Sequence, residues 1–193
     1  MTFEIYTNKG LNVLFLHIPK NAGVSVVTAL GINGPDIANH PKPEFFIRED
    51  QDFWNNALKL AVCRNPYTRL VSGYNFMKSS SGVEFPEFEQ FVEMIYLDEV
   101  NNKAIEPQVE WVSVKGLLVT DQINILRFEY IENDYNNFVQ DNNLSQVEPL
   151  GKLNSTDNVG KEGYYSDKNI VRMVREIYAD DFKTFNYNTK CLL

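Results

Sequence analysis

The sequence has little of what several common kinds of functional site require. It contains two cysteines and two histidines among 193 residues. Neither Cys-x-x-Cys nor His-Glu-x-x-His spacing occurs, so the sequence indicates no metal site. Cys63 and Cys191 are too few for a disulfide framework, and we expect both to be reduced thiols.

Long apolar runs and dense basic runs are also missing. No stretch approaches the roughly 20 apolar residues of a membrane helix, and no signal-peptide pattern opens the chain. We therefore expect a soluble, cytoplasmic protein without a membrane span. The formal charge of −8 and the pI of about 4.8 argue against nucleic acid or a long polyanion as partner. We prefer a smaller or less charged partner, and nothing in the sequence indicates the oligomeric state.

Apolar patterns indicate a single α/β domain covering residues 1–193, of which 44% are hydrophobic. Short apolar runs predict strands over 13–18, 58–63 and 123–128. Helical patterns cover 24–30, 66–77, 85–97, 131–140 and 167–182. Polar loops are expected over 31–43, 79–82 and 142–163. Strands that alternate with helices predict a mainly parallel central sheet flanked by helices on both faces.

A short polar loop follows the first predicted strand, directly before a helical pattern. Loop N–H groups and the unpaired N–H groups of a helix's first turn point at one spot, so this order favours a bound phosphate or sulfate. The lysine precedes the glycine here, whereas the usual nucleoside-triphosphate loop has it after the glycines. A tight turn with an exposed lysine is the alternative. The loop residues are Lys20, Asn21, Ala22, Gly23, Val24 and Ser25.

A second candidate anion site follows the second predicted strand. Pro66 suits the first position of a helix, which places Arg64 at the strand's carboxyl end and Ser72 within the helix. An anion could lie between them, although Arg64 could instead pair with a carboxylate and Ser72 could be packed. Arg69 could equally be a surface charge, and we assign it no role.

Both segments resemble motifs of the sulfotransferases. The sequence His-Ile-Pro-Lys-Asn-Ala-Gly-Val-Ser over 17–25 is similar to the phosphosulfate motif of the branch with the heparan 2-O and chondroitin enzymes. The sequence Cys-Arg-Asn-Pro-Tyr-Thr-Arg-Leu-Val-Ser-Gly-Tyr over 63–74 is similar to its 3'-phosphate motif. Later landmarks of that branch are resembled, in order, by segments 107–112, 125–129, 153–155 and 178–182.

The resemblance implies a three-layer fold like that of P-loop NTPases and a donor, 3'-phosphoadenosine 5'-phosphosulfate (PAPS). The sulfuryl group would pass, without a metal, to a hydroxyl of a carbohydrate or small glycoconjugate. Lys20 would stabilise charge on the leaving phosphate, and the N–H groups from Asn21 to Ser25 would hold the 5'-phosphate. Arg64 and Ser72 would bind the 3'-phosphate. The loop over 142–163 would close over the nucleotide and bring Lys161 to the 3'-phosphate.

The general base is the least determined part of this interpretation. His17 lies at the junction of strand and loop, where we expect it to support the loop. His40 lies between the two motifs, as a catalytic histidine does in the heparan 2-O branch, and an imidazole with a pKa near 6.5 suits proton abstraction. Glu44 and Glu110 are the rival bases.

Two other functions remain open from the sequence. One is phosphoryl transfer by a kinase-like enzyme of P-loop architecture, which would need a magnesium-binding acidic residue. The other is nucleotide binding without turnover on the same fold. The acceptor and its regiochemistry do not follow from the sequence.

Overall fold

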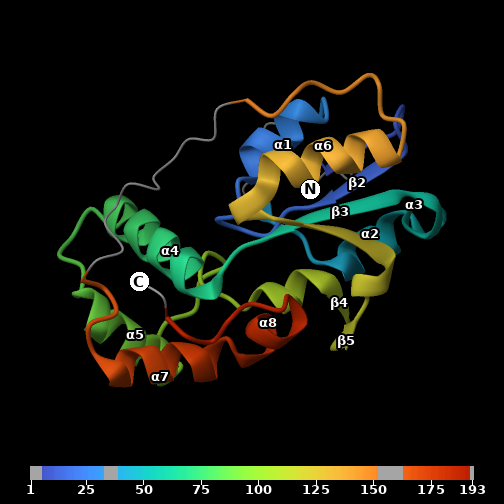
Figure 1. Ribbon diagram of the computed structural model, residues 1–193. Helices are drawn as coiled ribbons and strands as arrows, with labels where there is room; N and C mark the ends of the chain where they lie inside the picture. The colour runs from blue at the N-terminus through green and yellow to red at the C-terminus, as the bar shows by residue number, and fades with distance from the viewer. Residues whose placement is uncertain (1–5, 33–38, 152–162, 192–193) are drawn as a thin grey trace. The chain divides into compact units, whose positions relative to one another are not determined.

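The computed structural model describes residues 6–32, 39–151 and 163–191 (Figure 1). The chain groups into two compact units, and each is described by itself. The first unit comprises Met1–Cys63 and Gln108–Asn154, and the second comprises Arg64–Pro107 and Ser155–Leu193.

The first unit contains a four-stranded sheet of order β1-β2-β3-β6. The strands are β1 (Thr7–Asn8), β2 (Val13–Leu16), β3 (Leu58–Cys63) and β6 (Ile123–Arg127). β2, β3 and β6 are parallel, and the edge strand β1 runs antiparallel to β2. The mainly parallel sheet is thus confirmed, with β3 at its predicted bounds and with β2 and β6 ending slightly earlier than predicted.

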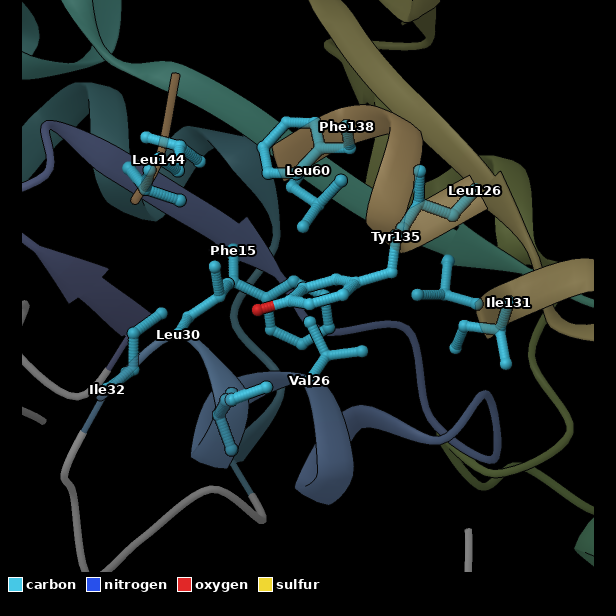
Figure 2. Packing of buried hydrophobic residues seen from close by; sticks show 14 residues of the cluster. Phe15, Val26, Leu30, Ile32, Leu60, Leu126, Ile131, Tyr135, Phe138 and Leu144 are labelled. Carbon is cyan, nitrogen blue, oxygen red and sulfur yellow. The ribbon is translucent and has the colours of Figure 1, made fainter. Parts of the chain in front are cut away.

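Helices α1 (Gly23–Ala29) and α6 (Ile131–Asp141) pack on one face of this sheet. Figure 2 shows their side chains meeting alternate sheet residues, among them Phe15, Leu60 and Leu126. The intervening residues Leu14 and Ala61 are buried as well. Burial on both faces explains why the strands appear in the sequence as continuous apolar runs.

Two short helices over 43–56 were not predicted. α2 (Pro43–Glu49) starts with proline at its first turn, and α3 (Gln51–Asn56) is capped by Asp50, whose carboxylate accepts from the Phe53 N–H at 2.9 Å. The predicted loop over 31–43 therefore ends where α2 begins. The rest of this unit includes η3 (Gln108–Val112), β4 (Ser113–Val114), β5 (Leu117–Leu118), η4 (Thr120–Gln122) and η5 (Phe128–Tyr130).

The second unit consists of helices and connecting loops, with no strand among its described residues. Its helices are α4 (Pro66–Ser80), α5 (Phe88–Tyr96), α7 (Lys168–Ile177) and α8 (Ala179–Thr184). α4 starts where predicted, because Pro66 fits the first turn and the Asn65 side chain accepts from the Tyr67 N–H at 3.0 Å. It runs on to Ser80, so the predicted loop over 79–82 starts two residues late.

The single helix predicted over 167–182 is wrong in one respect, because it divides at Tyr178 into α7 and α8. The buried Tyr178 hydroxyl donates to the carbonyl of Ile105 at 2.6 Å. Tyr164 and Tyr165 are partly buried and pack against the same aromatic core. Across the described ranges, none of the helices combines the length and apolarity needed to cross a bilayer.

Candidate functional site

The loop between β2 and α1 has an unusual backbone. Lys20 and Ala22 have φ angles of 69° and 58°, which place two non-glycine residues in the left-handed region around Asn21. Such conformations cost about 1–3 kcal/mol each and persist only where the surroundings hold them. The Lys20 side chain is half-buried in this loop.

Asn21 is the residue that holds the loop. It is 1% exposed, and its Nδ2 donates to the backbone carbonyl of Val62 at 2.7 Å and to Gln108 Oε1 at 2.8 Å. Its Oδ1 is buried and has no hydrogen-bond partner among the described residues. The loop is thus tied to β3 and to η3 by a side chain that the sequence suggested only as a source of backbone N–H.

Gly23 is required by a close packing contact. A Cβ atom at this position would overlap the imidazole of His17, which is 5% exposed. We expected Gly23 to let a ligand approach the backbone, but the close approach that the structure shows is that of His17. The ring of His17 also stacks on Phe15 at 5.5 Å and meets the ring of His40 edge-on at 4.2 Å, measured between centroids.

The remaining loop residues differ in their surroundings. Val24 is 60% exposed, and Ser25 is half-buried. The Ser25 N–H donates to the carbonyl of Ala22 at 3.1 Å, so this one of the predicted anion-binding N–H groups already has a partner within the turn.

His40 is anchored at three points. Its backbone N–H donates to the Tyr6 hydroxyl at 3.1 Å, and its carbonyl accepts from Trp111 Nε1 at 3.2 Å. Its Nδ1 lies 3.0 Å from the backbone carbonyl of His17. A carbonyl can only accept, so Nδ1 carries the proton, and Nε2 of the neutral ring keeps its lone pair. This is the tautomer that a general base at Nε2 needs.

The two rival carboxylates already bind surface groups. Glu44 accepts from the backbone N–H of Lys115 at 2.7 Å. Glu110 forms an ion pair with Lys42 at 3.1 Å, with both side chains partly exposed. The imidazole of His40, by contrast, makes a part-buried contact with the carbonyl of His17.

Arg64 and Ser72 lie in the second unit. Arg64 is 7% exposed, and its Nε donates to Thr68 Oγ1 at 3.0 Å. Thr68 and the half-buried Ser72 are four residues apart on α4 and so share one face of the helix. The guanidinium of Arg64 is therefore held against the face that carries Ser72. The sequence analysis missed Thr68, although Thr68 lies four residues from Arg64 and four residues from Ser72.

Arg69 is a buried structural residue. It is 1% exposed, and its guanidinium donates to the carbonyl of Glu106 at 2.8 Å. Burial lowers the pKa of Arg69, and the buried Asp181 carboxylate opposes this shift. The alternative of a surface charge is therefore wrong.

Comparison with known families decides the identity of the fold. A family model described as "Sulfotransferase family" matches residues 3–188. The chain belongs to the sulfotransferase family. Comparisons with curated proteins and with solved structures give no significant match.

Membership of the sulfotransferase family bears out two predictions from the sequence. The protein is a transferase of the sulfuryl-transfer type, and its α/β fold with a mainly parallel sheet is P-loop-like. The resemblance to the heparan 2-O branch stays a prediction.

Two further predictions for this sulfotransferase concern its lid and the absence of a metal. Lys161 and half of the predicted lid, residues 152–162, lie outside the described residues. Within 6–32, 39–151 and 163–191, no group of three or more His, Cys, Asp and Glu side chains could hold a metal ion.

Proposed function

We propose that this protein transfers the sulfuryl group of PAPS to a hydroxyl of a carbohydrate or small glycoconjugate. The acceptor oxygen attacks sulfur, and the bond between sulfur and the bridging oxygen of the 5'-phosphosulfate breaks. The hydroxyl proton passes to the general base. The products are the sulfated acceptor and adenosine 3',5'-bisphosphate.

The contact between His40 Nδ1 and the carbonyl of His17 is the observation that carries this proposal. This contact leaves Nε2 of His40 as the proton acceptor. That carbonyl belongs to the residue three positions before Lys20, so one short segment orients the base and supplies the loop lysine. We assign proton abstraction to His40 Nε2.

The loop also has the charge that an anionic donor requires. Segment 17–25 contains Lys20 and no acidic residue. The half-buried ammonium of Lys20 would stabilise negative charge that develops on the leaving phosphate. Backbone N–H groups at the start of α1 and the hydroxyl of Ser25 would bind the 5'-phosphate oxygens.

Arg64 and Ser72 would supply the specificity for PAPS. A guanidinium presents a fixed fork of donors that matches phosphate, and the bond to Thr68 holds its orientation. ATP lacks a 3'-phosphate, so this pair would discriminate against it.

Charge supports the choice of acceptor. The formal charge is −8, and the sequence has no dense run of Lys and Arg. A densely sulfated polysaccharide would approach against a repulsive field. A neutral or lightly charged sugar hydroxyl fits this surface better.

Calorimetry followed by a transfer assay tests the proposal. We expect adenosine 3',5'-bisphosphate to bind without magnesium and more tightly than ADP or ATP. Labelled sulfate should then move from PAPS to a member of a sugar panel. Preference for magnesium-ATP would overturn the proposal in favour of a kinase-like enzyme, and binding without transfer to any acceptor would indicate a non-catalytic nucleotide-binding protein.

A further inference from the structure

We infer that η3 is a bracket that holds the Lys20 loop and His40 in fixed positions, with Gln108 and Trp111 as positioning residues for the reaction. The meaning of this role for catalysis rests on the proposed function. Both residues belong to segment 107–112, which resembles a landmark of the family. Their side chains serve internal contacts, because both residues are 0% exposed.

Gln108 contacts the loop. Its Oε1 accepts from Asn21 Nδ2 at 2.8 Å, and Asn21 is itself 1% exposed. Asn21 lies between the left-handed residues Lys20 and Ala22. A buried amide pair that spans 87 residues of sequence therefore restrains the backbone that presents the Lys20 side chain.

Trp111 contacts the candidate base. Its Nε1 donates to the carbonyl of His40 at 3.2 Å. His40 has a φ of 41°, an unfavourable value for a residue with a side chain. The carbonyl of His40 accepts from Trp111, and its backbone N–H donates to the Tyr6 hydroxyl. These two hydrogen bonds stabilise the conformation of the residue. That conformation brings Nδ1 to the carbonyl of His17.

The geometry of η3 places both contacting side chains on one face of the same short helix. A 3-10 helix has about three residues per turn, so side chains at i and i+3 lie one above the other. Gln108 and Trp111 have this spacing in η3 (Gln108–Val112). One turn therefore contacts both the residue next to the loop lysine and the backbone of the base. The exposed ion pair between Glu110 and Lys42 adds an outer tie near His40.

Imidazole NMR tests the Trp111 contact without any substrate. The chain has two histidines, so His40→Gln assigns both ring signals. In the wild type, we expect His40 to carry its neutral-form proton on Nδ1. Trp111→Phe should shift His40 toward a mixture of tautomers, because the carbonyl of His40 loses its donor.

The chain supplies a matched control. Trp54 is the other tryptophan, is 5% exposed and lies in α3 of the same unit. Trp54→Phe should leave the His40 tautomer unchanged. If Trp111→Phe does not fold, β-(3-benzothienyl)alanine at position 111 removes the N–H while keeping the shape of the ring. An unchanged His40 tautomer in the folded variant would overturn the inference.

A kinetic cycle tests the link to catalysis. Trp111→Phe should reduce kcat by about tenfold in the wild type and have no further effect in His40→Ala, as expected for residues that act as a unit. An equal loss in both backgrounds would mean that Trp111 acts only through general stability, which would overturn the role.

Binding of adenosine 3',5'-bisphosphate tests the contact between Gln108 and the loop. Gln108→Leu should weaken adenosine 3',5'-bisphosphate several-fold, whereas the exposed Gln122→Leu should not. Unchanged affinity in Gln108→Leu would overturn this half of the bracket. If the wild-type protein bound none of this ligand, the proposed function would fail, and the tautomer measurement would still decide whether Trp111 positions His40.

Discussion

The two candidate anion-binding segments are held by different kinds of contact. In the first unit, the Lys20 loop has left-handed backbone at two residues and is tied to distant parts of the chain by Asn21. In the second unit, Ser72 lies on the regular helix α4, and Arg64, just before that helix, bonds to Thr68 four positions away. The first segment therefore depends on the tertiary structure, whereas the second is set mostly by local sequence.

This contrast suggests a division of labour. A loop that is built from long-range bonds can place charge at a defined point, which a transition state requires. An arginine beside a helix face can bind a phosphate firmly with less exact placement. Substitutions in the first unit should therefore reduce turnover most, and those in the second unit should reduce affinity most.

The largest effect should come from the base. His40→Ala should lower kcat by about 10²- to 10⁴-fold, because the acceptor proton loses its acceptor. Affinity for adenosine 3',5'-bisphosphate should change little. Steady-state kinetics with calorimetry measures both. Near-full turnover in this variant would remove His40 as the base and return attention to Glu44 and Glu110.

Loss of the loop lysine should be nearly as severe. Lys20→Ala should lower kcat by about 10²- to 10³-fold, as removal of one charge-stabilising donor does elsewhere. The exposed Lys190→Ala serves as the matched control and should retain wild-type rates. Equal activities for the two variants would show that Lys20 stabilises no charge in the transition state.

Arg64→Ala should act on binding more than on turnover. Losing a charge-assisted, forked contact should weaken adenosine 3',5'-bisphosphate by about 10- to 100-fold, from the 1.5–3 kcal/mol of such hydrogen bonds. Binding of adenosine 5'-monophosphate should be unaffected, since it lacks the 3'-phosphate. Calorimetry with both ligands measures the difference, and parallel losses for the two would contradict the assignment. Arg172→Ala, on the exposed face of α7, provides the control.

The smallest effects should come from replacing one glycine in each unit. An added Cβ would overlap the His17 ring at Gly23, and at Gly73 of α4 it would lie 2.8 Å from the carbonyl oxygen of Ala104. Each change to alanine should destabilise the fold by about 1–3 kcal/mol, as overpacking does. Thermal unfolding measures this, with Gly151→Ala as a control in open space.

The same two substitutions distinguish an effect on stability from an effect on kcat. Gly23→Ala should also lower kcat at temperatures where the protein remains folded, because the His17 ring must move and His40 packs against it. Gly73→Ala should leave kcat unchanged under those conditions. If the two variants had the same kcat, the packing of His17 over Gly23 would have no part in placing the base.

Local signals explain which elements could be predicted. β3 kept its predicted bounds because its apolar run is buried on both faces, and α4 started at Pro66 behind the Asn65 cap. The helices over 43–56 carried similar signals, Pro43 at a first turn and Asp50 as a cap, which the prediction overlooked. No local sequence signal marked the break at Tyr178, whose hydroxyl bonds to the distant Ile105.

The candidate site was only partly predictable for the same reason. The sequence indicated Lys20, His40, Arg64 and Ser72 as candidates, and their assignment to PAPS remains a proposal. It did not indicate that His17 occupies the space over Gly23, or that Gln108 and Trp111 reach Asn21 and His40. These contacts join residues that are far apart in the chain and obey no periodic pattern.

The sequence by itself determined the parallel strands and most of the longer helices, the family and the identity of the charged residues, because these follow from local patterning and spacing. Only the tertiary structure decided which nitrogen of His40 carries the proton and what holds the backbone of the Lys20 loop. The reason is that a hydrogen bond needs two groups within about 3 Å. Such proximity between distant residues arises only when the chain has folded.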